Sequence, residues 1–378
     1  MLAGQVIAMI QLNDFRRQWE DTREAAVEAF SAVGASGWYI LGNEVRAFEA
    51  ALASCWGVHH AIGVASGLDA LEIALRIAGC RPGDRVLTTP LSAFATTLAI
   101  VKLGAVPCFV DTDEHGLIDL ERCRAALAQR PDIRFLLPVH LYGHAVNSAG
   151  LAAIRDRFGC AIVEDCAQSV LASSGEKRTG TTGRLAATSF YPTKNLGAMG
   201  DGGAVLTNNG DDDAAARALR DYGQTGKYRH DVAGYNSRLD ELQAALMRRV
   251  YLPKLPEWTA RRKRIAARYL AGIRNPGVRP IPQPAWSDSV WHLFPVRVDP
   301  GRKQEFMRYL RENEVVSGEH YPAPIPDQNA LRGIPHELID DCATARAISR
   351  SEVSLPIHPY LTDEETDRVI DLCNRWQG

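Results

Sequence analysis

The chain has 378 residues, with 43 Lys and Arg against 45 Asp and Glu, so its net charge is −2. This near balance excludes the concentrated basic surplus typical of nucleic-acid-binding proteins, and a hydrophobic content of 46% argues against a disordered chain. The length is too great for one hydrophobic core, so we expect a large domain over residues 1–250 and a smaller one over 251–378.

The cysteines and the N-terminal stretch bear on the cellular compartment. The eight cysteines are scattered, and no two have the C-x-x-C spacing of a zinc or redox site. Residues 1–12 are mildly apolar but lack a basic leader, which makes them a poor signal peptide. No apolar run reaches the roughly 20 residues that span a bilayer. We therefore predict a cytoplasmic protein with reduced thiols and no membrane contact.

Short apolar strands and amphipathic helices alternate through the first two thirds of the chain. Strands are predicted at 84–89, 105–111, 134–140, 161–165 and 204–207, with helices at 70–78, 120–128 and 151–158. Strands that are apolar throughout and separated by helices indicate an α/β fold, with a mostly parallel central sheet flanked by helices. Polar residues such as His140 and Asp165 end the strands, at the edge where such sheets bind ligands.

The pattern changes after about residue 239. A long helical stretch covers 239–273, interrupted only by Pro253 and Pro256, and further helices are predicted at 303–313 and 363–375. Proline-rich turns and one strand-like segment lie between them. This composition predicts a smaller C-terminal α+β domain that is attached through the long helix.

The most informative segment is residues 187–208, in which Lys194 lies on a glycine-rich turn between two strands. Glycines allow positive φ angles and close backbone approach, so such a turn can direct a lysine into a site. Upstream, Asp165 ends a buried apolar strand, where a carboxylate is costly unless a cation pairs with it. Each feature alone also has an ordinary interpretation, as a surface turn and as a helix cap.

A third feature is the turn Ser66-Gly67-Leu68, which leads from a strand into a helix and can bind a phosphate with its amides and helix dipole. Many helices begin in this way, so the turn is weak evidence by itself. A phosphate cradle, a strand-end acid and a glycine-framed lysine on one parallel sheet are together the requirements of pyridoxal 5′-phosphate (PLP). The lysine would bond to the cofactor aldehyde, and the acid would keep the ring nitrogen protonated.

The sequence also resembles the DegT/DnrJ/EryC1/StrS family of PLP-dependent sugar aminotransferases, within the fold-type I superfamily. The resemblance runs nearly end to end. It rests on the segments 37–42, 66–69, 138–143, 164–168, 189–195, 200–203, 234–240, 320–322 and 354–356. Some members carry His in place of the lysine and act as dehydratases. The presence of Lys194 therefore favours transamination.

The resemblance implies a role for each matching position. Lys194 would be the lysine bound to PLP and the proton shuttle, Asp165 would pair with the pyridine nitrogen, and Gln168 would reach the ring hydroxyl. Ser189 would hold the phosphate together with Ser66 and the amides of Gly67 and Leu68. Asn236 would contact that phosphate from the neighbouring subunit of a homodimer, which would make the active sites shared. The alternative for Asn236 is a turn residue before the next helix.

One segment departs from the family pattern, which places an aromatic residue, stacked on the cofactor ring, a few positions after Pro90. Counting forward from Pro90 assigns Phe94 to this position, whereas counting back from Gly104 assigns Ala93. We favour Phe94, because an unstacked ring would lose roughly 0.5–1.5 kcal/mol of aromatic contact. The alternative is that Phe94 belongs to the ordinary core.

Family members mostly aminate a ketone of a nucleotide-linked sugar with glutamate as donor, which is the function we expect here. Lys227, Tyr228 and Arg229 are candidates for binding the nucleotide or its diphosphate, although an exposed mobile loop is an equal alternative. By resemblance His320 and Tyr321 face the sugar, unless they form a structural Tyr-Pro turn.

Two other functions stay open at this point. The enzyme could act on a non-nucleotide ketone, such as a cyclitol or an aminobenzoate precursor. It could also be a PLP-binding regulator without turnover, although the intact set of Lys194, Asp165 and Gln168 counts against that. We interpret His140 as a hydrogen-bonded core histidine rather than a general base. No metal site is predicted.

Overall fold

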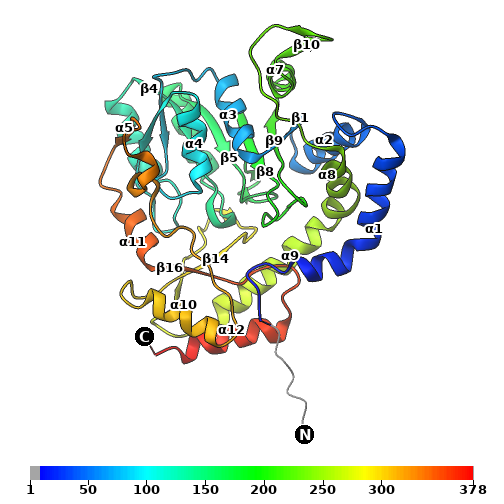
Figure 1. Cartoon of the computed structure of the whole chain (residues 1–378). Coiled ribbons are helices and arrows are strands. Elements are labelled where there is room, and N and C mark those ends of the chain that lie inside the picture. Colours follow the sequence, from blue (N-terminus) through cyan, green and yellow to red (C-terminus); the bar gives the residue numbers. More distant parts are fainter. Residues whose placement is uncertain (1–8, 378) are drawn as a thin grey trace.

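Eight strands form the central sheet, in the order β1-β9-β8-β5-β4-β2-β3-β15 (Figure 1). The computed structural model describes residues 9–377. The pairs from β8 to β15 are parallel, while β9 runs antiparallel to both β8 and β1. The strands are β1 (His60–Val64), β2 (Arg85–Thr88), β3 (Val106–Phe109), β4 (Ile133–Leu137), β5 (Ala161–Asp165), β8 (Leu185–Ser189), β9 (Gly203–Thr207) and β15 (Glu337–Leu338). This sheet confirms the predicted fold class.

Two hydrophobic cores lie on the two faces of this sheet. Successive strand side chains point to opposite faces, so Leu136 and Ile162 belong to one core while Phe135 and Val163 belong to the other. Helices α5 (Leu120–Gln129) and α6 (Ser148–Phe158) cover the first face. The second face is covered by α3 (Gly67–Ile77), α4 (Phe94–Lys102) and α7 (Gly210–Arg220).

A third core gathers the helices beside β1 and β9. It includes residues of α1 (Phe15–Ser36), α2 (Asn43–Trp56), α8 (Glu241–Leu246) and α9 (Leu252–Gly272). A π-helical turn, Met247–Tyr251, joins α8 to α9, so the predicted helical stretch is nearly continuous. Pro253 lies just after the π-helical turn, and Pro256 lies inside α9, so neither proline ends the helical stretch. Helices α1 and α2 were not among the predicted elements.

The C-terminal part builds its own small core around an antiparallel sheet of β12 (Arg279–Pro280), β14 (Phe294–Arg297) and β16 (Glu352–Leu355). Helices α10 (Lys303–Glu312) and α12 (Asp363–Arg375) pack there, below the large sheet in Figure 1. Not all of the C-terminal residues belong to this small core. Helix α11 (Ala343–Ser351) joins a core of the large sheet, and β15 pairs with β3.

The remaining strands are short. β6 (Ser173–Ser174), β7 (Lys177–Arg178) and β13 (Ser287–Asp288) form one small sheet, and β10 (Gln224–Gly226) and β11 (Arg229–His230) form a hairpin. None of the helices within residues 9–377 is both long and apolar enough to traverse a bilayer. Most of the N-terminal segment interpreted as a poor signal peptide, residues 1–8 of 1–12, falls outside the described part of the chain.

A buried ion pair fixes the strand that leads to the phosphate turn. Glu49 of α2 accepts a hydrogen bond from the amide of Gly63 in β1 (2.9 Å) and pairs with Arg220 of α7. Arg220 in turn donates to the carbonyl of Gly63 at 2.8 Å. Both side chains are buried. Together they attach the end of β1 to two helices and therefore set where residues 66–68 begin.

Glu49→Ala should lower the free energy of unfolding by about 3–5 kcal/mol, because it leaves Arg220 as a buried, unpaired cation. Urea denaturation measures this change. Asp371→Ala is the matched control, since its ion pair with Arg375 is exposed and should contribute less than about 1 kcal/mol. Equal effects of the two substitutions would show that the buried pair does not hold β1.

Candidate active site

A pocket of about 370 Å³ at the carboxyl edge of the central sheet brings most of the predicted site residues together. The predicted residues that line it are Ser66, Gly67, Leu68, Asp165, Gln168, Ser189, Lys194, His320 and Tyr321. They come from the ends of strands β5 and β8, the start of α3, the loop between β8 and β9, and a segment of the C-terminal part. Their convergence follows from the parallel sheet, which aligns its loops at one edge.

Lys194 lies in the loop between β8 and β9, as predicted. Its amide closes a turn on the carbonyl of Tyr191 at 2.8 Å. Gly197 permits this tight path, because a Cβ there would overlap the carbonyl of Pro192. Burial lowers the pKa of the Lys194 amine from 10.5 to about 8, while the charge of Asp165 acts in the opposite direction. At neutral pH the amine therefore loses its proton more readily than an exposed lysine, which favours its reaction with an aldehyde.

Asp165 is buried at the end of β5, where neutral groups orient it. Thr96 donates a hydrogen bond to Oδ2 at 2.8 Å, and the amide of Ala167 donates to Oδ1 at 3.1 Å. Burial raises the pKa of the Asp165 carboxyl. Among residues 9–377 no cationic group lies within ion-pair distance of it. A carboxylate in this position calls for a cation from outside the chain, and a protonated pyridine nitrogen fits that requirement.

The predicted phosphate cradle is formed where α3 begins against the end of β8. Ser66 is the N-cap of α3, and its side chain accepts from the amide of Asp69 at 3.1 Å. A Cβ at Gly67 would lie 2.5 Å from Cβ of Ser189, so only glycine fits beside that serine. The free amides at the start of the helix and the hydroxyl of Ser189 line the same pocket, which fits a phosphate group.

Gln168 links the large sheet to the C-terminal segment. Its Oε1 accepts from the amide of Tyr142 at 2.7 Å, and its Nε2 donates to the hydroxyl of Tyr321 at 3.2 Å. Burial raises the pKa of Tyr321 above its usual range, so this hydroxyl stays protonated. The predicted contact of Gln168 with the cofactor hydroxyl stays a prediction, and the side chain lines the pocket as that role requires.

The structure does not support the predicted stacking of Phe94 on the cofactor ring. Phe94 is the first residue of α4 and packs against the core that contains Leu91 and Tyr142. Its two neighbours, Ala93 and Ala95, line the pocket instead. The helix that follows begins at Phe94 itself, so the ring is turned toward the sheet core. The alternative count, which places Ala93 at this position, agrees better with the geometry.

Four further predicted residues do not reach this pocket within one chain. Lys227, Tyr228 and Arg229 lie on the hairpin β10–β11, which projects from the top of the molecule in Figure 1. Tyr228 is 83% exposed, and none of the three lines the pocket. Asn236 is exposed and lies beside Asp221. These positions match the exposed-loop alternative for the hairpin within a single subunit.

The interpretation of His140 as a core histidine is confirmed. It is buried, its Nε2 lies 3.0 Å from Oε2 of Glu164, and its Nδ1 accepts from the amide of Val146 at 3.0 Å. Glu164 in turn accepts from the amides of Gly180, Thr182 and Gly183. All of these contacts are internal, so the group serves to hold the loops behind the pocket.

Sequence reasoning missed several polar residues that line the pocket, among them Thr96 and His292. Thr96 orients Asp165 through its hydroxyl. His292 hydrogen-bonds Asn195 through Nδ1 at 3.1 Å, and burial lowers its pKa far enough to keep the ring neutral. Thr96 follows Phe94 by two positions, and a polar residue in an apolar helix facing the strand ends was the available signal. His292 gave no such signal, because it comes from a distant segment just before β14.

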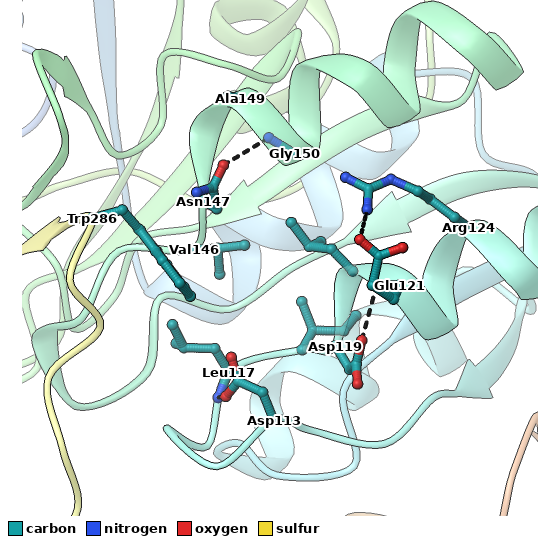
Figure 2. Close-up of a pocket in the computed structure, with 12 residues that line it drawn as sticks. Asp113, Leu117, Asp119, Glu121, Arg124, Val146, Asn147, Ala149, Gly150 and Trp286 are labelled. Carbon is teal, nitrogen blue, oxygen red and sulfur yellow. Dashed lines mark hydrogen bonds and ion pairs between the residues drawn. The ribbon is translucent and has the colours of Figure 1, made fainter.

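A second cavity, of about 510 Å³, lies apart from Lys194 (Figure 2). Trp286 forms one side of it, facing Val146 and Leu117, and the pair of Glu121 and Arg124 lies on the other. Its polar groups are already engaged in capping helices α5 and α6. No predicted site residue lines this larger cavity. The chemistry therefore belongs to the smaller pocket.

Comparison with known proteins agrees with this geometry. A model of the DegT/DnrJ/EryC1/StrS aminotransferase family matches residues 20–374. The chain is 41% identical to dTDP-3-amino-3,4,6-trideoxy-alpha-D-glucose transaminase of Streptomyces venezuelae, with 96% of this chain and 95% of the relative covered. Its structure is similar to that of S. venezuelae DesV, with a TM-score of 0.93, 39% identity and 98% of each chain covered. A structure of ntda from Bacillus subtilis with bound cofactor PMP (TM-score 0.84, 26% identity) covers 93% of this chain and 81% of its own.

The lowered pKa of Lys194 gives a test that needs no cofactor. In the cofactor-free protein, labelling of Lys194 by acetic anhydride should rise with pH around a midpoint near 8 instead of 10.5, as followed by mass spectrometry of its peptide. Asp165→Asn removes the negative charge that opposes deprotonation, so its midpoint should move to lower pH. A midpoint near 10.5 in the wild type would place Lys194 in solvent.

Proposed function

The chain belongs to the DegT/DnrJ/EryC1/StrS aminotransferase family, and from this premise we propose that it is a PLP-dependent enzyme that transfers an amino group from glutamate to a ketone of a nucleotide-linked sugar. The observation that carries the proposal is one pocket in which a lysine of lowered pKa, a buried acid without a cation and a helix N-terminus converge. The product would be an amino sugar. A relative of similar length, the S. venezuelae transaminase, supports a dTDP-linked sugar as the substrate class.

PLP, when bound, supplies an aldehyde that accepts the amino group and a ring that withdraws electrons. The residues around it have distinct tasks. Asp165, oriented by Thr96, would keep the ring nitrogen protonated, and the start of α3 with Ser189 would bind the phosphate. The amine of Lys194 would hold the aldehyde between turnovers. In its neutral form, which its pKa of about 8 makes accessible at neutral pH, Nζ of Lys194 would take up and return a proton at the substrate carbon.

The same proposal includes a homodimer with shared active sites. Apolar side chains gather in an exposed patch made of Tyr39, Ile40, Met199 and Leu242. Its members are adjacent: the amide of Glu241 donates to the carbonyl of Tyr39, and Gln243 binds both the amide and carbonyl of Met199. Met199 belongs to the loop that carries Lys194, so a second copy seated on this patch would lie beside the pocket.

In such a dimer, the predicted site residues that do not line the pocket of their own subunit can contribute to the pocket of the other subunit. The same subunit exposes Asn236 and the hairpin with Lys227, Tyr228 and Arg229. Arg229 pairs with Asp231 on the hairpin itself. We infer that they reach the partner's pocket, Asn236 at the phosphate and the hairpin at the nucleotide. This explains why a cationic and aromatic loop stands far from the lysine of its own chain.

Lys194→Ala should abolish turnover and the visible absorbance of the lysine-linked cofactor while leaving the protein folded. Mixing the wild-type holoenzyme with glutamate alone should convert the cofactor to its amine form, which absorption spectra follow in a single turnover. Lys177→Ala, on an exposed strand far from the pocket, is the control and should convert normally. A wild-type protein that binds PLP but shows no conversion would support the regulator instead.

Leu242→Glu should weaken the proposed dimer, because a charge replaces an apolar contact at the centre of the patch. Light scattering after gel filtration measures the mass, and PLP retention on dialysis measures the effect on the site. Leu270→Glu is the matched control, since Leu270 has similar exposure on α9 but lies outside the patch. A Leu242→Glu dimer as stable as the wild type would remove the patch from the interface.

A further inference from the structure

Three side chains form a hydrogen-bonded chain behind the wall of the Lys194 pocket. Nδ1 of His320 lies 2.9 Å from Oγ of Ser354, and Oγ of Ser354 lies 2.5 Å from Oε1 of Glu352. Strand β16 explains the arrangement, because Glu352 and Ser354 are two positions apart and so share one face of the strand. Both are fully buried, whereas the ring of His320 lines the pocket.

The ionisation state of Glu352 sets the direction of each hydrogen bond among these three side chains. The backbone amide of His320 can only donate, and it donates to Oε2 of Glu352 at 2.7 Å. An ionised Glu352 accepts on both oxygens, so Ser354 donates its hydroxyl proton to Oε1. The hydroxyl oxygen of Ser354 then accepts from Nδ1–H of His320. The neutral ring consequently carries its proton on Nδ1 and leaves Nε2 as an acceptor.

The position of the ring is fixed as well as its tautomer. Tyr142 donates a hydrogen bond from its hydroxyl to the carbonyl of His320 at 2.8 Å, and Gln168 holds the next residue, Tyr321. Burial and the charge of Lys194 lower the pKa of His320 to about 4, so the ring stays neutral at physiological pH. In the described part of the chain, Nε2 of His320 has no hydrogen-bond partner.

We propose that Glu352 and Ser354 are positioning residues that hold His320 with its proton on Nδ1, so that Nε2 accepts a hydrogen bond from a hydroxyl group of the sugar substrate. A sugar hydroxyl can donate and accept, and an acceptor beside the lysine selects the orientation in which the hydroxyl donates, which orients the ring that carries the ketone. This inference rests on the proposed function and names the chemistry by which the acceptor substrate is recognised. Glutamate, the amino donor, has no hydroxyl and does not need this contact.

Protonation of Glu352 would reverse the chain. Burial raises the pKa of Glu352 to about 7, against the hydrogen bonds from Ser354 and His320 and the charge of Lys303. A protonated Glu352 donates to Ser354, whose hydroxyl then donates to Nδ1 of His320 and moves the ring proton to Nε2. As the pH falls through about 7, Nε2 therefore changes from an acceptor to a donor, and the hydroxyl proton of the sugar loses its acceptor. The other titratable groups that face Glu352 are Glu319, Tyr142, Tyr321 and Arg297.

Glu352→Gln makes this reversal permanent. Its amide oxygen must accept from the backbone amide of His320, so its amide nitrogen donates to Ser354 and the hydroxyl turns toward Nδ1. We expect the KM for a dTDP-linked keto sugar to rise about 5- to 10-fold, the value of one hydrogen bond, with conversion of the cofactor by glutamate alone unchanged. Wild-type KM should rise as the pH falls below 7, whereas the KM of Glu352→Gln should be flat.

The tautomer is read directly by ¹⁵N NMR of histidine-labelled protein, with the His320 signals assigned by their loss in His320→Asn. Wild type at pH 8 should show protonated Nδ1, and Glu352→Gln should show protonated Nε2. Glu319→Gln is the control, because Glu319 pairs with Lys303 at 2.6 Å and does not belong to the hydrogen-bonded set of His320, Ser354 and Glu352. It should behave as the wild type.

Some outcomes would overturn the proposal. They are an unchanged tautomer in Glu352→Gln, an unchanged KM for the sugar, or an equal loss of the glutamate reaction, which would indicate general damage to the fold. If Glu352→Gln does not fold, Ser354→Ala and the wild-type pH series decide, since both break or reverse the same link. If glutamate does not convert the cofactor of the wild-type enzyme, the proposed function is wrong. The tautomer of His320 measured by NMR tests the hydrogen bonds to Ser354 and Glu352 independently of turnover.

Discussion

A carboxylate buried at the carboxyl edge of the sheet, with no cation from residues 9–377 at ion-pair distance, is the constraint on which the site depends. Asp165 is oriented only by a threonine hydroxyl and a backbone amide, and these offset part of the cost of its burial. Burial lowers the pKa of the Lys194 amine and so favours its neutral form. Both groups are thus closer to neutrality than they would be in water. A cofactor with a protonated ring nitrogen would supply the charge that Asp165 lacks, and its aldehyde would react with the neutral amine of Lys194.

Much of the fold could be predicted from local sequence because parallel strands are apolar on both faces. The predicted strands near residues 85, 106, 134 and 161 match β2 to β5 within a few residues at either end. Other elements gave no local signal. β15 has two residues and exists only because β3 offers an unpaired edge, and α1 and α2 depend on packing against α8. The proposed boundary at residue 250 was drawn from composition, which does not report that α11 returns to the large sheet.

Some residues of the site could also be predicted from the sequence, and others could not. Lys194 and Asp165 could be predicted from the sequence, because the chemistry requires a lysine on a glycine-rich turn and an acid at the end of a strand. The sequence could not decide between Phe94 and Ala93, because a one-residue difference in helix length changes the count; the packing of α4 places Phe94 against the core and Ala93 at the pocket. Glu352 was not singled out, and Ser354 was noted only within the matching segment 354–356. Their contact with His320 depends on the arrangement of β16 in the folded chain, which the local sequence does not report.

The return of the chain to the large sheet through β15 also limits how the molecule can move. A small domain joined through one helix can swing as a rigid lid, but here the C-terminal part is anchored at both ends. α9 leaves the large core, and β15 and α11 re-enter it. His320 and Tyr321 lie on the span between those two anchors. Access to the pocket is therefore gated by local adjustments of that span and not by the separation of two bodies.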